Sequence, residues 1–238
     1  MNQNEMKEIV GREAVEALVK SGMKLGLGTG STAISAVRHI GFLLSQGKLK
    51  DILAVPTSFQ TSIECDKLCI PMVTLNSWII GGKLDLTIDG ADEVDSRNRL
   101  VKGGGGALLP EKIVAYSSAS YAIVVDESKM VESLGFSCSV PVEVIPFARI
   151  PVTMALEKLG AEVKLREAMQ KAGPVVTDQG NLLLDIRFKE EVDPVAMEAR
   201  INIIPGVIEN GFFTGPADRP LRPVVFIGHN DGKVERRD

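Results

Sequence analysis

Acidic residues gather in the middle of the sequence, directly after a short apolar pattern. Apolar and polar residues alternate from Leu84 to Ile88, which predicts a half-buried strand that ends at Asp89. Gly90 breaks this strand, and a loop follows. The acidic residues of the segment are Asp89, Asp92, Glu93 and Asp95. Because like charges packed this closely repel one another, a purely structural segment has little reason to collect them, and we expect a functional site.

The same stretch continues with a lysine, a glycine run and a second carboxylate. Lys102 precedes four glycines at 103–106. Without Cβ atoms, such a run lets backbone N–H groups come close to a ligand oxygen. Pro110 suits the first position of a helix, which puts Glu111 in the first turn, where the helix dipole favours a negative charge. The segment therefore offers carboxylates, one ammonium, a string of backbone donors and a carboxylate on a rigid element, which together indicate a site.

Other interpretations of this stretch have to be weighed. An acidic loop is often simply solvated, and a glycine run is often a flexible connection. A calcium-binding loop is a third alternative. Counted from Asp89, however, the sixth position should be glycine and is Val94, and the twelfth should be glutamate and is Leu100. Since the spacing does not fit, we expect no metal ion here.

A second glycine-rich turn lies nearer the N-terminus. Residues 23–27 predict a strand, and the residues from Ala33 onward predict a helix. The residues between them are Gly28, Thr29, Gly30, Ser31 and Thr32. A glycine turn between a strand and a helix points free N–H groups and the positive end of the helix dipole at an anion. We expect an anion site with Thr29, Ser31 and Thr32 as side-chain donors, with a mere tight turn as the alternative.

Two nucleotide-binding motifs do not fit this turn. The dinucleotide fingerprint G-x-G-x-x-G, counted from Gly26, has Ser31 where its third glycine should be. The next expected strand, 52–55, is followed by Pro56-Thr57-Ser58 and not by an acidic residue. A P-loop would need a lysine before the hydroxyl residue, and the turn has none. A small phosphate monoester therefore fits better than a nucleotide.

The composition argues against several classes of partner. The 238 residues are 45% apolar and 24% charged, with a net charge of −4 and no basic arm, so we expect no nucleic acid. There is no apolar run of membrane-spanning length, and the polar residues 1–8 do not resemble a signal peptide, so we expect no membrane. The sparse cysteines, Cys65, Cys69 and Cys138, suit a cytoplasmic protein and do not form a zinc pattern.

The order of the expected elements indicates an α/β fold. Helical periodicity covers residues 4–21, and helices are expected between the early strands. The expected strands are residues 23–27, 52–55, 71–75, 84–89 and 122–125. Each is followed by polar residues, and in an open parallel sheet ligands gather at the carboxyl ends of the strands. We therefore predict a mainly parallel open sheet with helices on both faces, whose loops converge on one crevice.

The pattern changes after about residue 136. Short strands lack long crossovers, and Asp193-Pro194 is typical of a helix start. The expected strands here are residues 142–145, 163–165, 175–177, 182–186 and 207–213, and the expected helices are 151–159 and 194–202. These elements predict a small α+β, ferredoxin-like domain at 136–213, which serves as a lid or a subunit interface. It is inserted into a catalytic domain of residues 1–135 and 214–238, to which a strand at 224–227 returns.

Together these stretches resemble ribose-5-phosphate isomerase of the A type. The matching segments are GLGTGST at 26–32, TIDGADEVD at 87–95, KGGGGALLPEKIVA at 102–115, VVDESKMVESLG at 124–135, PVEVIPFA at 141–148 and NIIPGV at 202–207. Two departures are Gly106, where some relatives have alanine, and a somewhat longer stretch around 164–173. We expect neither to touch the chemistry.

The resemblance implies an isomerase that interconverts ribose 5-phosphate and ribulose 5-phosphate through an enediolate, without a cofactor, as a homodimer or homotetramer. It implies Glu111 as the catalytic base, supported by Asp89, Asp92 and Lys102. The substrate contacts that it implies are Lys7, Thr29, Gly30, Ser31, Thr32, Asp89, Gly90, Ala91, Asp92, Lys102, Gly103, Gly104, Gly105 and Lys129.

Two other functions remain as alternatives. A deaminating sugar-phosphate isomerase should have a histidine near its acidic loop, whereas His39 and His229 lie outside the candidate motifs and are expected at the surface or in packing. A sugar-phosphate sensor should carry a DNA-reading domain, for which the segment before Met23 is too short and the net charge unsuitable.

Overall fold

The computed structural model describes residues 2–215 and 222–238, and its contacts group the chain into two compact units. Unit 1 comprises the described residues of Met1–Ala91, Pro110–Lys129 and Arg222–Asp238. Unit 2 comprises those of Asp92–Leu109 and Met130–Leu221. Each unit has its own hydrophobic core and is described by itself.

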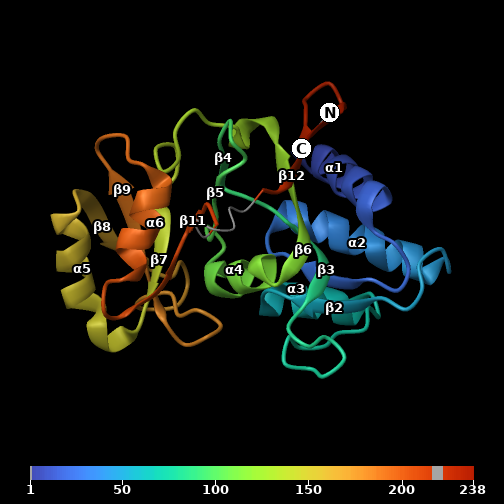
Figure 1. The fold of residues 1–238 in the computed structure, drawn as a ribbon, viewed down its shortest axis with the longest axis horizontal. Helices are drawn as coiled ribbons and strands as arrows, with labels where there is room; N and C mark the ends of the chain where they lie inside the picture. Colours follow the sequence, from blue (N-terminus) through green and yellow to red (C-terminus); the bar gives the residue numbers. More distant parts are fainter. Residues whose placement is uncertain (1, 216–221) are drawn as a thin grey trace. The chain divides into compact units, whose positions relative to one another are not determined.

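Unit 1 is built on a six-stranded sheet with the order β13-β12-β6-β3-β1-β2 (Figure 1). Its strands are β1 Lys24–Leu27, β2 Leu53–Pro56, β3 Leu84–Asp89, β6 Ser118–Asp126, β12 Val224–Gly228 and β13 Val234–Arg237. All neighbours are parallel except β12 and β13. The carboxyl ends of β1, β2, β3 and β6 therefore lie along one edge, as the sequence predicted.

Helices cover both faces of this sheet. They are α1 Gln3–Leu18, α2 Ser31–Ser45, α3 Phe59–Lys67 and α4 Leu108–Tyr116. On one face, Val10 of α1 and Ile40 of α2 share a core with Leu25 of β1. On the other face, Val114 of α4 packs with Leu84 and other apolar residues. The predicted α/β fold, a mainly parallel sheet with helices on both faces, is confirmed.

Unit 2 contains a β–α–β–β–α–β arrangement with an antiparallel four-stranded sheet of order β10-β7-β9-β8. Its elements are β7 Val140–Val144, α5 Arg149–Lys158, β8 Ala161–Leu165, β9 Leu182–Phe188, α6 Pro194–Asn202 and β10 Val207–Asn210. Val142 of β7, Leu156 of α5 and Ile201 of α6 share one core, so both helices cover the same face. This is the ferredoxin-like arrangement.

A smaller three-stranded sheet in unit 2 was not predicted. It joins β4 Glu93–Val94, β5 Leu100–Val101 and β11 Phe212–Phe213 in the order β11-β5-β4. Gly211 allows it, because a Cβ there would lie 2.5 Å from Lys102 O and 2.6 Å from Pro141 Cδ. The single strand predicted at 207–213 is therefore wrong: the chain leaves β7 at Asn210 and pairs with β5 after Gly211.

Other differences from the predicted elements are local. Residues 71–75 form one bridge, between Ala54 and Met72, and residues 175–177 form one, between Val176 and Leu182. Turns at Thr74 and Thr177 end both segments before a ladder can form. Strand β13 was not predicted. The predicted domain boundaries, 135/136 and 213/214, remain a prediction, although the contacts also group 92–109 with unit 2; residues 216–221 of that prediction lie outside the described ones.

One buried acid lies on the sheet face opposite α5 and α6. Glu143 of β7 is fully buried, and its Oε1 accepts hydrogen bonds from Thr177 Oγ1 at 2.8 Å and Asn181 Nδ2 at 2.9 Å. Burial raises the pKa of Glu143; the bonds from Asn181 and Thr177 oppose this, while the negative charges of Asp178 and Glu209 add to it. No described residue bonds to its Oε2.

We predict that Glu143→Gln stabilises the protein at neutral pH. Because the folded-state pKa of Glu143 is raised, the folded state binds the extra proton, and stability falls as pH rises from the unfolded pKa through the folded one. The amide keeps an acceptor for Thr177 and Asn181 but has no charge to desolvate. In urea unfolding from pH 4 to pH 8, the free energy of unfolding of Glu143→Gln should exceed that of wild type by an amount that is small at pH 4 and increases toward pH 8. A Glu162→Gln control, at an exposed pair with Lys189, should show no such trend.

Candidate active site

Asp89 ends β3 in unit 1 and is fully buried. Its Oδ1 accepts hydrogen bonds from Thr29 N at 3.1 Å and from Gly90 N at 2.7 Å. A Cβ on Gly28 would lie 2.0 Å from the same oxygen, so only glycine fits where the turn after β1 crosses this carboxylate. The acidic loop and the glycine turn are therefore brought together at the end of two neighbouring parallel strands.

Hydroxyl groups lock the turn after β1 to the end of β2. Thr29 Oγ1 lies 2.8 Å from Thr57 Oγ1 and 2.7 Å from Ser58 Oγ. Thr61 Oγ1 donates to Gly28 O at 2.7 Å. The sequence predicted Thr29 as a side-chain donor to an anion, but in this structure its hydroxyl is engaged within the protein. The side chains of Thr57, Ser58 and Thr61 are supports that sequence reasoning missed.

Helix α2 begins directly after this turn. Its N-cap is Gly30, whose φ of 98° requires glycine and which has no side chain to cap the helix. Ser31 is exposed and Thr32 is half-buried in the first helical turn. An uncapped first turn carries free N–H groups and partial positive charge, which is what an anion needs. Lys7 lies half-buried on α1, which packs against α2.

Glu111 lies in the first turn of α4 and is only 4% exposed. The helix begins at Leu108, two residues before the predicted start, so Pro110 is its third residue; proline is tolerated there because first-turn N–H groups have no helical partner. A Cβ on Gly26 would lie 2.4 Å from Val114 Cγ1, which shows how closely α4 packs on β1. Glu111 is therefore carried by a firmly seated helix.

The acidic loop divides into two structural and two candidate catalytic carboxylates. In unit 2, buried Glu93 accepts hydrogen bonds from Ser137 N at 2.9 Å and Cys138 N at 2.7 Å. Buried Asp95 accepts from Arg99 N at 2.8 Å and Arg99 Nε at 2.6 Å. The expectation that a structural segment has no reason to collect these charges is wrong for both residues, because each carboxylate has its own donors.

Asp92 holds the glycine run. Its Oδ2 accepts the N–H of Gly104 at 2.7 Å, and a Cβ on Gly104 would lie 2.6 Å from Asp92 Oδ1. Lys102 is 2% exposed, and its Nζ lies 5.6 Å from the centre of the Phe213 ring. Gly103 has a φ of 97°, a conformation that favours glycine. Gly104 and Gly105 are exposed residues.

Lys129 lies at the end of a short helix, Glu127–Lys129, that follows β6 in unit 1. Glu127 is bound by His229 Nδ1 at 2.7 Å and by Asn230 Nδ2 at 2.5 Å. The Glu127 carboxylate, and with it Glu235, raises the pKa of His229. His229 therefore supports the segment that carries Lys129, a role that its position outside the candidate motifs did not indicate.

Comparison with known proteins identifies the family. A model of the ribose 5-phosphate isomerase A (phosphoriboisomerase A) family matches residues 53–232. The chain belongs to this family. It is 52% identical over 242 residues to the ribose-5-phosphate isomerase A of Treponema denticola, covering 99% of both chains. The protein of Treponema pallidum is 51% identical, covering 97% of this chain and 92% of the other.

Solved structures of ribose-5-phosphate isomerases agree with this membership. The enzyme of Methanocaldococcus jannaschii is 40% identical, with a TM-score of 0.90 over 100% of both chains. A D-ribose-5-phosphate isomerase in complex with phospho-erythronic acid is 39% identical, with a TM-score of 0.93 over 100% of both chains. The predicted family is confirmed, and with it an isomerase that interconverts ribose 5-phosphate and ribulose 5-phosphate. The roles of individual residues remain predictions.

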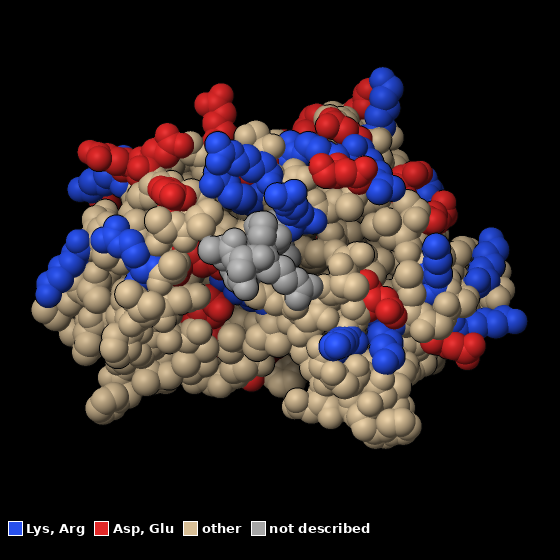
Figure 2. All heavy atoms as spheres, in the orientation of Figure 1, with Lys and Arg blue, Asp and Glu red and all other residues tan. Residues whose placement is uncertain are grey.

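Within 2–215 and 222–238, no helix is long and apolar enough to cross a membrane, and no three His, Cys, Asp or Glu side chains gather as a metal would need. On the face drawn in Figure 2, the described Lys and Arg side chains are interspersed with Asp and Glu.

We predict that Gly28→Ala inactivates this isomerase without unfolding it. A Cβ at 2.0 Å from Asp89 Oδ1 must displace the carboxylate or the turn, and a misplacement of about 1 Å can cost on the order of a hundred-fold in rate. The measurement is kcat/KM for ribose 5-phosphate, with circular dichroism to verify folding. Asp89→Asn, which keeps the shape of the side chain, serves as the comparison. A folded Gly28→Ala protein with wild-type kcat/KM would contradict the close approach described here.

Proposed function

We propose that Glu111 is the base that moves a proton between C1 and C2 of the open-chain pentose 5-phosphate. Starting from the aldose, its carboxylate takes the C2 proton, the electrons of that C–H bond form the C1–C2 double bond, and the π electrons of the C1 carbonyl move onto O1, which gives an enediolate. The protonated Glu111 then returns the proton to C1, while a second proton passes from O2 to O1, which gives the ketose. The burial of Glu111 in the first turn of a firmly packed helix supports this role.

The enediolate intermediate needs positive charge and hydrogen-bond donors. We assign these to Lys102, whose ammonium is buried, and to the N–H groups of Gly103 and Gly105, because the N–H of Gly104 is bound by Asp92. Asp89 and Asp92 hold the sugar hydroxyls and assist opening of the furanose ring. Because the reaction oxidises one carbon of the substrate and reduces its neighbour, no external redox cofactor is required.

The phosphate group is assigned to the turn before α2. Ser31 and Thr32 offer first-turn N–H groups and two hydroxyls, and Lys7 and Lys129 add positive charge. Gly30, whose N–H donates to Gln60 Oε1 at 3.1 Å, gives the turn its shape. Gly90 and Ala91 are placed along the substrate chain. Thr29 orders this turn through its hydroxyl network and through its N–H, which donates to Asp89 Oδ1.

The related isomerase that was solved with phospho-erythronic acid supports the choice of ligand. The carboxylate of that acid has two oxygens where an enediolate has O1 and O2, next to the same phosphorylated chain. We propose a cytoplasmic homodimer or homotetramer as the working form. Exposed apolar side chains on each unit, such as Trp78 and Phe147, support association.

The test of this function is exchange of the substrate's C2 proton with deuterated solvent. Wild type should isomerise ribose 5-phosphate and catalyse exchange. Glu111→Gln keeps size and hydrogen bonding but cannot take a proton, so both rates should fall on the order of a hundred- to ten-thousand-fold. Binding of ribose 5-phosphate should change little, because its phosphate and hydroxyl contacts lie elsewhere. Normal exchange in Glu111→Gln would exclude Glu111 as the base.

The phosphate assignment makes a different kinetic prediction. Thr32→Val removes a hydroxyl at nearly constant volume, and phosphate contacts persist from the ground state to the transition state. We expect KM for ribose 5-phosphate to rise roughly ten-fold with kcat within about two-fold of wild type. Thr153→Val, at a helix position where the hydroxyl bonds Arg149 O, is the matched control. A loss confined to kcat would show that this turn does not hold the phosphate.

A further inference from the structure

Arg166 links the four-stranded sheet of unit 2 to the glycine run. It directly follows β8, and its backbone N donates to Leu183 O of β9 at 2.9 Å. Its Nε donates to Asp185 Oδ2 at 2.8 Å, and its Nη2 donates to Asp185 Oδ1. The side chains of Arg166 and Asp185 are 17% and 23% exposed. This two-point, half-buried pairing fixes the plane of the guanidinium group.

The Nη1 group of the same guanidinium donates to the glycine run. Arg166 Nη1 donates to Gly104 O at 3.0 Å and to Gly103 O at 3.2 Å. Gly103 O also accepts the N–H of Gly106 at 2.9 Å, and a Cβ on Gly106 would lie 3.3 Å from Leu183 Cδ1. The carbonyl groups of the glycine run are therefore hydrogen-bonded to a residue that is itself bound to the four-stranded sheet. The stretch 164–173, which we expected not to touch the chemistry, contacts two predicted site residues through Arg166.

Holding a carbonyl fixes the direction of the next N–H group. A trans peptide is planar, so its C=O and N–H bonds point in opposite directions. With Gly103 O held by Arg166, the N–H of Gly104 points away, toward Asp92 Oδ2 at 2.7 Å. With Gly104 O held, the N–H of Gly105 also points away from the guanidinium. Consecutive glycines have little conformational preference of their own, so contacts from outside the run decide which way these amides point. These contacts come from the Arg166–Asp185 pair, which we call the clamp.

We propose that Arg166, oriented by Asp185, is a positioning residue: it aims the N–H of Gly105 at the enediolate, and it keeps the N–H of Gly104 on Asp92 Oδ2, where that N–H holds the carboxylate. This inference rests on the proposed function, in which the Gly105 amide stabilises the intermediate and Asp92 holds a sugar hydroxyl. Preorganised donors cost no reorientation at the moment of reaction, which is why their direction matters more than their number. Substrate binding in the ground state depends on the phosphate turn and is expected to depend little on the clamp.

A purely structural role, anchoring the loop to the sheet, predicts lost stability but no selective loss of turnover. The two roles predict different affinities of the variant proteins for a mimic of the enediolate. Phospho-erythronic acid carries a carboxylate where the intermediate is charged, so its affinity reports how well the amides are aimed. A structural anchor has no reason to weaken this ligand more than it weakens ribose 5-phosphate.

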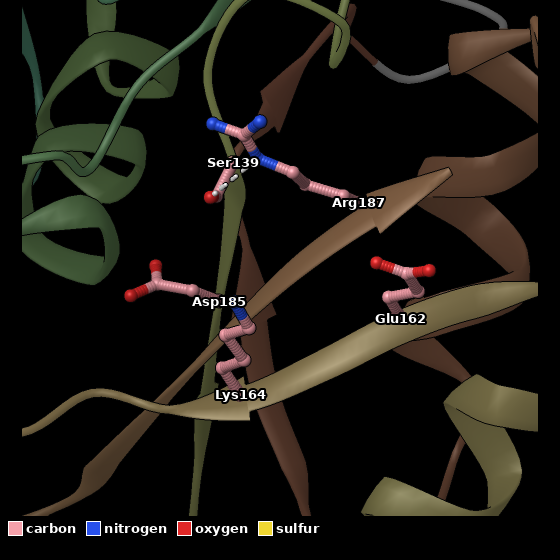
Figure 3. A pocket seen from close by; sticks show the side chains of 5 residues that line it. All are labelled: Ser139, Glu162, Lys164, Asp185 and Arg187. Atoms are coloured by element: carbon pink, nitrogen blue, oxygen red, sulfur yellow. Dashed lines mark hydrogen bonds between the residues drawn. The ribbon is translucent and has the colours of Figure 1, made fainter. Parts of the chain in front are cut away.

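A neighbouring arginine provides a matched control. Arg187 lies on β9 two residues beyond Asp185, and its Nε donates to Ser139 Oγ at 3.2 Å. Figure 3 shows Arg187 directed at Ser139 and Asp185 extending from the same strand, beside a hollow of about 410 Å³ that Lys164 and Glu162 also line. Arg187→Lys therefore makes the same substitution on the same sheet, at a residue bonded to Ser139 and not to the glycine run.

The experiment compares Arg166→Lys, Asp185→Asn and Arg187→Lys with wild type. Lysine keeps the charge at 166 but cannot hold Asp185 at two points and the two carbonyls together. For Arg166→Lys we expect kcat to fall roughly ten- to a hundred-fold, the Kd of phospho-erythronic acid to rise by a similar factor, and KM to stay within about three-fold. Asp185→Asn should lower kcat and raise the Kd of phospho-erythronic acid by smaller factors, again with little change in KM. Arg187→Lys should match wild type in all three quantities.

The inference is overturned if folded Arg166→Lys and Asp185→Asn proteins keep wild-type kcat and Kd, even with lower unfolding midpoints. If Arg166→Lys does not fold, Asp185→Asn, which preserves the shape of the acid, decides by the same criterion. Wild-type isomerisation and solvent exchange measured in parallel separate this result from the proposed function. If wild type lacked both, the proposed function would fail together with the clamp's role in it, whereas an active wild type with unaffected clamp variants would overturn the clamp alone.

Discussion

The buried carboxylate of Asp89 is the constraint on which unit 1 depends. It ends β3 and binds the N–H of Thr29, which belongs to the turn after the neighbouring strand β1. The contact leaves no room for a side chain at Gly28, where a Cβ would lie 2.0 Å from Asp89 Oδ1. Since that turn leads directly into α2, the same interaction sets where the uncapped N-terminus of α2 begins. One carboxylate thus couples the end of β3 to the expected phosphate site.

In unit 2, a carboxylate three residues later in the chain makes the same kind of contact with a glycine-containing backbone. Asp92 binds the N–H of Gly104 and excludes a side chain there, as Asp89 does at Gly28. The other side of the glycine run is held through its carbonyls by Arg166. Glycine is required at these positions because a charged side chain and a backbone must come within hydrogen-bond distance. Each N–H group fixes the position of the carboxylate that it binds.

Sequence reasoning was most successful where the signal is local. The strand at 84–89, the glycine turn before α2 and the placement of Glu111 in a first helical turn all follow from patterns within about ten residues. The chain order of short strands and helices also predicted the parallel part of the six-stranded sheet and the existence of the second, antiparallel sheet, but neither β13 nor the three-stranded sheet. These features depend on periodicity and turn chemistry, which the sequence carries directly.

What the sequence could not predict depends on partners far along the chain. Glu93 accepts its hydrogen bonds from Ser137 and Cys138, more than forty residues later, so its structural role had no local signal. The Arg166–Asp185 pair exists only once β8 and β9 pair, with Lys164 opposite Asp185. Two-residue strands such as β4 and β5 are too short for any periodic pattern.

The central proposal is that the turn before α2 and the glycine run both bind the pentose phosphate substrate. Amide NMR of the 15N-labelled protein during titration with phospho-erythronic acid tests it most directly. The account predicts that the N–H resonances of Gly30, Ser31 and Thr32 and those of Gly104 and Gly105 shift together, with a single dissociation constant. Shifts confined to one group, or two groups with different dissociation constants, would contradict it.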